Sequence, residues 1–130
     1  MKTDKQIKGA LGEDAVCAEL ERRGHRILER NYRRRCGEID IISEIGSYIV
    51  FTEVKARKTG SMVSGLEAVD PAKKRKIILT ADIYLTENPC DMYVRYDIAE
   101  VRLTGGSFPR VIGVDIYEDA FDTEGIYTIN

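Results

Sequence analysis

The chain opens with apolar residues at intervals of three or four, which is the spacing of one face of a helix. Thr3 or Asp4 can cap the start of this segment, and Gly24 follows it as a C-terminal stop. We therefore expect a helix over about residues 4–23. Its apolar stripe would be formed by Ile7, Leu11, Ala15 and Ala18.

A second helical pattern follows Asp70-Pro71. Aspartate can accept hydrogen bonds from the first free amides of a helix, and proline suits the first helical position. The pattern should end at Asn88-Pro89, because proline cannot continue a helix. Its apolar positions are Ile77, Ile78, Ala81, Tyr84 and Leu85.

Runs of apolar, β-branched and aromatic residues predict strands between and after the helices. Three runs lie between the helices, over residues 25–32, 37–43 and 48–55, and Glu44-Ile45-Gly46-Ser47 is predicted as a hairpin turn. A fourth covers residues 92–103. The order α-β-β-β-α-β predicts an α/β fold in which helices flank a mixed sheet that contains an antiparallel hairpin.

The segment after Gly105-Gly106 is harder to assign. Residues 111–117 can form a further strand, and an acidic tail begins at Asp115. We expect one domain over residues 1–130, with a core at about 3–104 and a C-terminal extension over 105–130. A solvated terminus is the favoured interpretation of the tail, and docking on the basic surface of a neighbouring subunit is the alternative.

Composition indicates an ordinary globular protein, since 43% of its residues are hydrophobic and 32% are charged. The start of the chain has no apolar run typical of a signal peptide, and no stretch is long enough to span a membrane, so we expect a cytoplasmic location. Cys17, Cys36 and Cys90 are widely spaced, which argues against disulfides and a zinc site and favours small, half-buried apolar roles. With His25 as the only histidine, a Ser/His/Asp triad or a multi-histidine metal site has little material.

The net charge of −2 conceals an asymmetry along the chain. Residues 1–76 carry 17 Lys and Arg against 12 Asp and Glu, whereas residues 77–130 carry 3 against 10. A basic half is compatible with a polyanionic ligand on one face of the protein. Solvated surface charge accounts for the same numbers equally well.

The predicted hairpin carries the most informative residues. If its turn centres on Ile45-Gly46, Ser43 pairs with Tyr48. Counting back then places Glu38 opposite Glu53 and Asp40 opposite Phe51. Paired residues share a face and side chains alternate, so one face of the sheet should carry Glu38, Asp40, Glu53 and Lys55. A shift of two pairs keeps this arrangement, whereas a shift of one destroys it.

Acidic side chains crowded on neighbouring strands repel one another unless a cation or a proton neutralises them. Mg²⁺ prefers one or two carboxylates together with waters and phosphate oxygens. Asp40 and Glu53 would hold Mg²⁺ or Mn²⁺, and Lys55 would orient the attacking water or stabilise charge on the phosphate. Glu13 and Glu38 could assist through water or a second metal. The simpler alternative is a solvent-facing charge pattern, since E-x-K is common on strands.

Several blocks of the sequence resemble the YraN-type family, a group of small, largely uncharacterised bacterial proteins. That family is assigned to the PD-(D/E)XK nuclease superfamily, near the archaeal Holliday-junction resolvases. The resemblance covers roughly residues 8–103, and the G-E-I-D and F-x-E-V-K blocks make it specific. The matching residues are Gly12-Glu13, Gly24, Asn31-Tyr32-Arg33, Gly37 to Ile42, Val50 to Arg57, and Ala68-Val69 through Lys73.

The resemblance implies a restriction-endonuclease-like core. It places Asp40, Glu53 and Lys55 at the D…ExK positions of the superfamily and Glu13 where related resolvases carry a helix-borne acid that assists metal binding. Ile39 replaces the proline of the superfamily's name. The segment after Gly106 is long for the family.

Basic residues surround these blocks. Lys73 to Lys76 lie at the start of the second helix, where cations oppose the helix dipole, so a ligand is a plausible reason for them. Such residues would grip phosphates without reading sequence. Tyr84 should belong to the core, Tyr32 and Tyr48 could stack on bases, and Arg95 and Asp97 should form a structural ion pair. The predicted nucleic-acid contacts are Arg33, Arg35, Arg57, Lys73 and Lys76.

Our leading interpretation is an Mg²⁺- or Mn²⁺-dependent endonuclease (a hydrolase) that acts on structured DNA, such as a branch or junction. The alternatives are a nucleic-acid-binding protein that has the nuclease fold without turnover, and a protein-interaction domain. Resolvase-like relatives suggest a homodimer, because two symmetric cuts need two sites. The sequence leaves open DNA versus RNA, substrate shape and catalytic activity.

Overall fold

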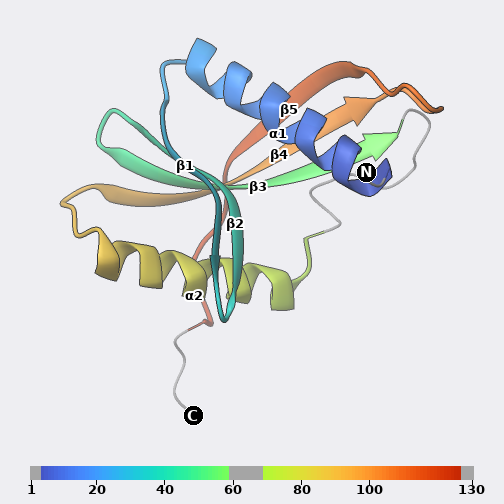
Figure 1. The fold of residues 1–130 in the computed structure, drawn as a ribbon. Coiled ribbons are helices and arrows are strands. Elements are labelled where there is room, and N and C mark those ends of the chain that lie inside the picture. The colour runs from blue at the N-terminus through green and yellow to red at the C-terminus, as the bar shows by residue number, and fades with distance from the viewer. Residues whose placement is uncertain (1–3, 59–68, 127–130) are drawn as a thin grey trace.

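The computed structural model describes residues 4–58 and 69–126. Figure 1 shows helices packed against both faces of a sheet. The order confirms the predicted α-β-β-β-α-β core, and the further strand predicted over residues 111–117 is present as a fifth strand. The elements are α1 (Asp4–Arg22), β1 (Arg26–Arg34), β2 (Gly37–Ile45), β3 (Tyr48–Lys58), α2 (Pro71–Glu87), β4 (Tyr93–Leu103) and β5 (Val111–Phe121).

The sheet is mixed, with its strands in the order β1-β2-β3-β4-β5. Only the β3–β4 pair is parallel, and the other three are antiparallel. Parallel neighbours need a crossover, and α2 lies in the segment that connects these two strands. The predicted cap is present, since the Asp70 carboxylate accepts a 2.8 Å hydrogen bond from the amide of Lys73.

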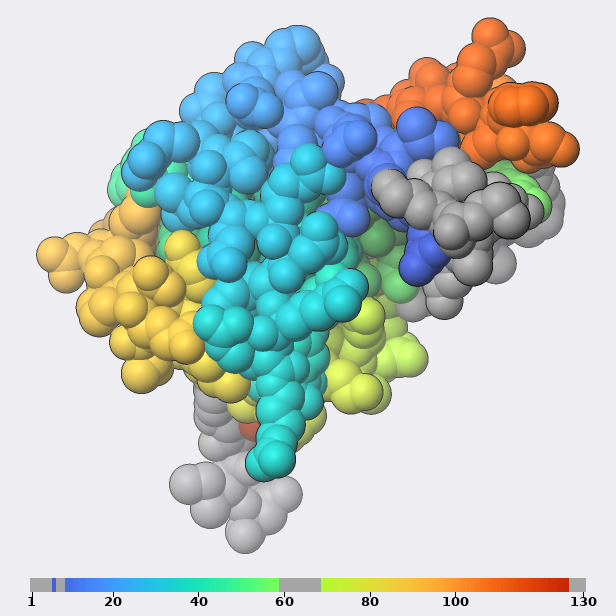
Figure 2. Space-filling model, in the orientation of Figure 1, coloured from blue at the N-terminus to red at the C-terminus, as the bar shows by residue number. Residues whose placement is uncertain are grey.

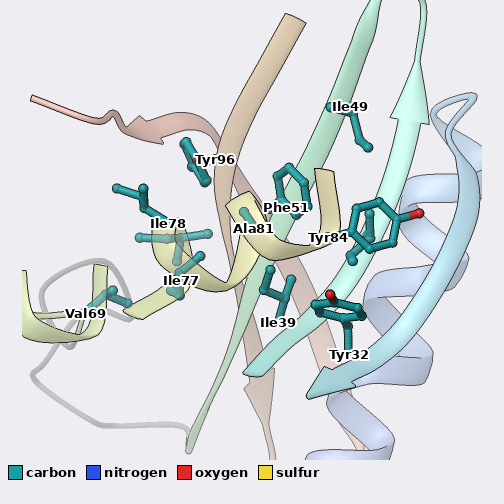
Figure 3. Packing of buried hydrophobic residues seen from close by; sticks show 12 residues of the cluster. Tyr32, Ile39, Ile49, Phe51, Val69, Ile77, Ile78, Ala81, Tyr84 and Tyr96 are labelled. Atoms are coloured by element: carbon teal, nitrogen blue, oxygen red, sulfur yellow. The ribbon is translucent and has the colours of Figure 1, made fainter. Parts of the chain in front are cut away.

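The α2 face of the sheet holds the larger core cluster (Figure 3). Tyr84 is 7% exposed, as predicted for a core residue, and its ring meets that of Tyr32 edge-on at 5.2 Å. Tyr32 is 2% exposed, so the prediction that it stacks on bases is wrong. Apolar spacing placed all five predicted α2 positions, of which Ile77, Ile78, Ala81 and Tyr84 are buried and Leu85 is partly buried.

The α1 face holds the second cluster, which confirms the predicted sheet flanked by helices. Helix α1 (blue in Figure 1 and Figure 2) lies on the face opposite α2 (yellow). Here the predicted stripe of α1 is partly wrong, because Ala18 is exposed and Ala15 is only partly buried. The helix instead buries Val16, Cys17 and Leu20 against strand residues such as Val101. Gly24 has a φ of +100°, which suits its predicted place just after the helix.

The C-terminal segment differs most from expectation. Residues 115–121 belong to β5, an edge strand that pairs with β4, so the predicted acidic tail is largely a strand. In the register of these two strands, Asp115 lies opposite Glu100. The predicted structural ion pair on β4 is confirmed, since both guanidinium contacts of Arg95 to Asp97 measure 2.9 Å.

The three cysteines are free. Cys17 is buried and Cys36 is partly buried, as predicted, but Cys90 is exposed beyond the end of α2. Among the described residues, neither helix has the length and apolar character needed to cross a membrane.

Candidate active site

The β2–β3 hairpin has a tighter turn than predicted. Ile45 pairs with Tyr48, which leaves only Gly46-Ser47 between the strands, and Gly46 adopts a φ of +56°. Ser43 therefore faces Val50 rather than Tyr48. This is a shift of the predicted register that preserves the parity of the pairs, and so the expected shared face survives.

Regular pairing of β2 with β3 ends at Ile41 and Thr52, and Asp40 lies just beyond. Its Oδ2 atom accepts a 2.7 Å hydrogen bond from the amide of Val54. The side chain thus takes over a backbone donor at the point where the strands separate. The bond fixes the carboxylate of Asp40 beside Glu53.

Asp40 and Glu53 form a hydrogen-bonded pair of carboxyl groups. Glu53 is only 4% exposed. Burial, and then the neighbouring charge of Asp40, raise the pKa of Glu53 to about 7. Burial also raises the pKa of Asp40, although the Val54 amide acts in the opposite direction. The pair therefore shares a proton near neutral pH, or needs a cation in its place.

Two lysines approach Glu53 from different elements. Lys55 Nζ lies 3.6 Å from Glu53 Oε1 on the same strand. Lys73 Nζ reaches the same oxygen at 3.5 Å from the first turns of α2. Lys55 was predicted to lie here, whereas the direct contact of Lys73 with Glu53 was not.

A cavity of about 550 Å³ opens beside Asp40, between α1 and the first two strands. Glu13 and Glu38 both line it. Burial, and then the charge of Asp40, raise the pKa of Glu13. Oε1 of Glu13 is buried and has no hydrogen-bond partner among the residues described, although the side chain bonds Asn31. An unpartnered carboxylate oxygen beside an acid pair is an oxygen ligand open to a cation.

Sequence reasoning missed Asn31 as part of this cavity wall. It adopts a φ of +53°, a left-handed conformation that asparagine tolerates better than most residues. The only signal in the sequence was its place in the N-Y-R block. A second, smaller cavity of about 90 Å³ brings Glu13 and Asp40 together with Val54 and Ala56 of β3.

These acids fit a magnesium ion better than a zinc ion. Across residues 4–58 and 69–126, no three Asp, Glu, His or Cys side chains converge to hold a metal by themselves. Asp40 and Glu53 supply two carboxylates at one point, and Mg²⁺ commonly takes one or two, with water and phosphate oxygens completing its shell. Glu13 is placed to contribute through water.

The remaining predicted cations divide into two groups. Arg33 lines the larger cavity and pairs with Glu38 at 3.3 Å. Arg57 pairs with the buried Glu100 at 3.2 Å, which ties it to β4. Arg35 and Lys76 are exposed, and no contact connects them to the carboxyl pair.

Comparison with known proteins assigns the chain to a family. The model of the uncharacterised protein family UPF0102 matches residues 12–101. The chain belongs to this family. A UPF0102 protein of Acetivibrio thermocellus is 44% identical over 92% of this chain and 95% of its own length. One of Desulforapulum autotrophicum is 42% identical over 95% of this chain and all of its own length.

The predicted resemblance to the YraN-type family is thereby confirmed. A UPF0102 protein of Geobacter sulfurreducens is 38% identical over 82% of this chain and 84% of its own length. The UPF0102 match includes every predicted site residue from Glu13 to Lys76 and ends within β4. Strand β5 lies outside it.

Proposed function

We propose that this protein is a metal-dependent endonuclease that hydrolyses phosphodiester bonds in structured DNA. The observation that carries the proposal is the pair formed by the half-buried Asp40 and the buried Glu53, whose carboxyl groups share a hydrogen bond beside Lys55 and Lys73. Two adjacent acids in a largely buried place are costly unless something uses them. A cation and a phosphate group account for all four side chains together.

Asp40 and Glu53 would hold Mg²⁺ or Mn²⁺. When bound, such an ion would polarise a phosphoryl oxygen and offset the negative charge that develops there. The Val54 amide keeps Asp40 in position through its 2.7 Å bond, so this ligand needs no rearrangement. Glu13 and Glu38 line the cavity beside it, where they can hold water in the outer shell.

The two lysines supply the positive charge that the phosphate needs. Lys55 is 30% exposed at its side chain and would hold the attacking water or the phosphate oxygen it approaches. Lys73 has a side chain that is 43% exposed, so it can contact a neighbouring phosphate while it remains close to Glu53. With a cation bound at Glu53, the ammonium groups of Lys55 and Lys73 would be available to the substrate.

In this proposal the DNA backbone would lie along the cavity beside Asp40. Its wall includes Arg33, whose side chain is 74% exposed and can exchange Glu38 for a phosphate. Arg35, Arg57 and Lys76 would extend this basic surface. A branched or junction-like substrate, and a homodimer that cuts both strands, follow from the resemblance to resolvases.

Cleavage of a labelled four-way junction and a linear duplex, each with Mg²⁺, Mn²⁺ or EDTA, tests the proposal. We expect metal-dependent nicking that favours the junction. Asp40→Asn and Glu53→Gln should each lower the rate by a factor on the order of a hundred or more. Asp14→Asn is the matched control, because this exposed acid lies on α1 next to Glu13 and pairs with Arg30.

Circular dichroism and thermal unfolding of each variant would establish that it is folded. Full activity in a folded Asp40→Asn or Glu53→Gln protein would refute the assignment, and so would cleavage that persists in EDTA. Equal loss in Asp14→Asn would mean that the effect is not specific to the carboxyl pair.

A nucleic-acid-binding protein without turnover is the second candidate. The observation in its favour is that Lys55 and Lys73 lie 3.6 and 3.5 Å from Glu53 and offset part of its charge, so a proton shared with Asp40 is enough to keep the acid pair without a metal. This candidate predicts salt-sensitive DNA binding that is the same with Mg²⁺ and EDTA, with no cleavage of either substrate.

A further inference from the structure

A second concave surface lies at the other end of β3. A cavity of about 590 Å³ is lined by the first residues of β3 and β4 and by residues near the end of β5. A neighbouring cavity of about 270 Å³ has Val94 and Asp119 in its wall as well. Tyr48 begins β3, five residues before Glu53. At about 3.3 Å per residue, this surface is about 16 Å from the carboxyl pair along the strand.

Large apolar side chains are exposed at the larger cavity. Tyr93 is 70% exposed, Tyr48 42% and Val94 40%. The two tyrosine rings lie 5.9 Å apart at an angle of 46°, and the guanidinium of Arg95 lies 5.5 Å from the centre of the Tyr48 ring. An exposed aromatic pair in a hollow is typical of a surface that a partner covers.

The walls of this surface are held rigidly. Asp97 is fully buried and accepts hydrogen bonds from Arg95 and from the amide of Asp119 at 3.0 Å. Three residues of β5 bulge opposite Asp97, and Asp119 within the bulge has a φ of +52°. A preformed wall reduces the entropy lost on binding.

The charge of this surface is negative. Four acidic side chains line the walls of the two cavities. The cations at these walls already have partners, because Arg95 pairs with Asp97 at 2.9 Å and lies 4.0 Å from Glu118, and Lys74 lies over the ring of Phe121. A nucleic acid would be repelled here, whereas a cation would be attracted and could also lie against a tyrosine ring. The acids are Asp82, Glu118, Asp119 and Asp122.

The smaller cavity is suited to an apolar side chain. Leu85, Tyr96 and Phe121 line it, and Tyr96 stacks on Phe121 at 5.2 Å and on Phe51 at 5.8 Å. Figure 3 shows Tyr96 at the margin of the α2 core. This wall is therefore continuous with the core of the protein.

We propose that these two cavities bind a basic segment of another protein. An arginine or lysine of that segment lies beside Tyr48 and Tyr93, close to Glu118, and an apolar side chain enters the smaller cavity. The surface is separate from the carboxyl pair, so a partner held here leaves the cavity beside Asp40 open. The inference does not depend on nuclease activity.

Selection of a random peptide library on the full-length protein tests this inference, followed by fluorescence anisotropy of the selected peptides. We expect the peptides to be enriched in arginine or lysine together with an apolar residue, and to bind more weakly as salt is raised. Tyr93→Ala and Glu118→Lys should each weaken binding by about tenfold or more.

Two matched variants are the controls. Phe108→Ala removes another aromatic side chain, which is 91% exposed in the β4–β5 connection, and Glu21→Lys reverses an exposed acid on α1. Both should bind the selected peptides as the unaltered protein does. The inference is wrong if no peptide is selected, if the selected peptides are not basic, or if they bind Tyr93→Ala and Glu118→Lys unchanged.

Discussion

Two acidic side chains on neighbouring strands of the sheet are buried in opposite ways. Asp97 on β4 is the register partner of Thr52, the residue before Glu53 on β3. Asp97 on β4 is fully buried and accepts three hydrogen bonds, two from Arg95 and one from the Asp119 amide. Glu53 on β3 is almost as buried, yet its neighbours are another acid and two lysines at 3.5 and 3.6 Å. One acid is satisfied within the fold, and the other is incomplete without a proton or a cation.

The difference separates stability from function. A buried ion pair with good geometry holds a structure in one arrangement, whereas a crowded pair of acids lowers stability and is retained for another reason. Burial alone therefore does not identify a site. The partners of each buried acid are more informative: those of Asp97 indicate a role in the fold, and those of Glu53 support the proposed metal site.

The largest effect should come from breaking the satisfied pair. Asp97→Ala leaves the guanidinium of Arg95, only 13% exposed, and the Asp119 amide without their acceptor. We expect a loss of about 3–5 kcal/mol in the free energy of unfolding, measured with urea. Glu53→Gln should lose none, because glutamine keeps the shape of the side chain and removes one of two adjacent acids. Equal losses in the two variants would abolish the distinction.

Stabilisation by bound metal should be the next largest effect, and it should depend on Glu53 and not on Asp97. Mg²⁺ that binds the folded protein stabilises it by about 3 kcal/mol at a hundred times its dissociation constant. This gain should shrink below neutral pH, because Glu53, with a pKa raised to about 7, then holds a proton. Thermal unfolding with Mg²⁺ and with EDTA measures it.

The variant Glu53→Gln should lose this gain, whereas Asp14→Asn should keep it. A metal-induced rise of the same size in Glu53→Gln would place the ion elsewhere on the protein.

How far the sequence predicted the surroundings of Glu53 and of Asp97 depends on the kind of signal. Alternation along β2 and β3 has a period of two, so the shared face of Asp40 and Glu53 survived an error in turn length. The turn itself was ambiguous, because Ile45 fits a strand as well as a turn. The Arg95–Asp97 ion pair was predictable because the two residues are two positions apart on one strand, so their side chains share a face.

Long-range features were not predictable from local patterns. Lys73 meets Glu53 because the first turns of α2 bring its side chain to the sheet, and the periodicity of the sequence does not record that approach. Acidic residues from Asp115 onward resembled a solvated tail, since β5 is an edge strand with only partly buried positions. The stripe of α1 was misjudged because the neighbouring strands, and not the helix, determine which small residues are covered.

A smaller effect concerns the pH dependence of stability. The folded protein keeps a proton on Glu53 up to about pH 7, whereas the unfolded chain loses it near pH 4.5, so the folded state binds more protons in between. Stability should therefore fall as pH rises through this window. Glu53→Gln has no such proton, and its advantage over the unaltered protein should grow between about pH 5 and pH 7 and then level off.

Urea unfolding across this pH range measures the difference. Glu87→Gln is the control: the pKa of Glu87 is lowered, so what its charge contributes is lost only on acidification below this window. Its stability should run parallel to that of the unaltered protein. A Glu53→Gln curve that is also parallel would show that the acid pair is not strained.

The smallest effects concern Asn31 and Asp119, which have a left-handed backbone conformation and lie in the two edge strands β1 and β5. Asp119 contributes its amide to Asp97, and a glycine would supply the same amide without strain, whereas alanine in this conformation costs about 1–2 kcal/mol. The free energy of unfolding of Asp119→Gly should thus lie within about 0.5 kcal/mol of that of the unaltered protein. That of Asp119→Ala should be about 1 kcal/mol lower. A loss as large in Asp119→Gly would mean that the side chain, and not the amide, supports Asp97.

Asn31 should respond differently, because its side chain bonds Glu13. Asn31→Gly keeps the backbone conformation, with a φ of +53°, but removes that bond. Urea unfolding should therefore show a change of less than about 1 kcal/mol, while metal-dependent cleavage falls because Glu13 is no longer positioned. Unchanged cleavage would remove Asn31 and Glu13 from the site. Both glycine variants keep the left-handed backbone conformation. Of the two, only Asn31→Gly, at the cavity beside Asp40, should lose activity.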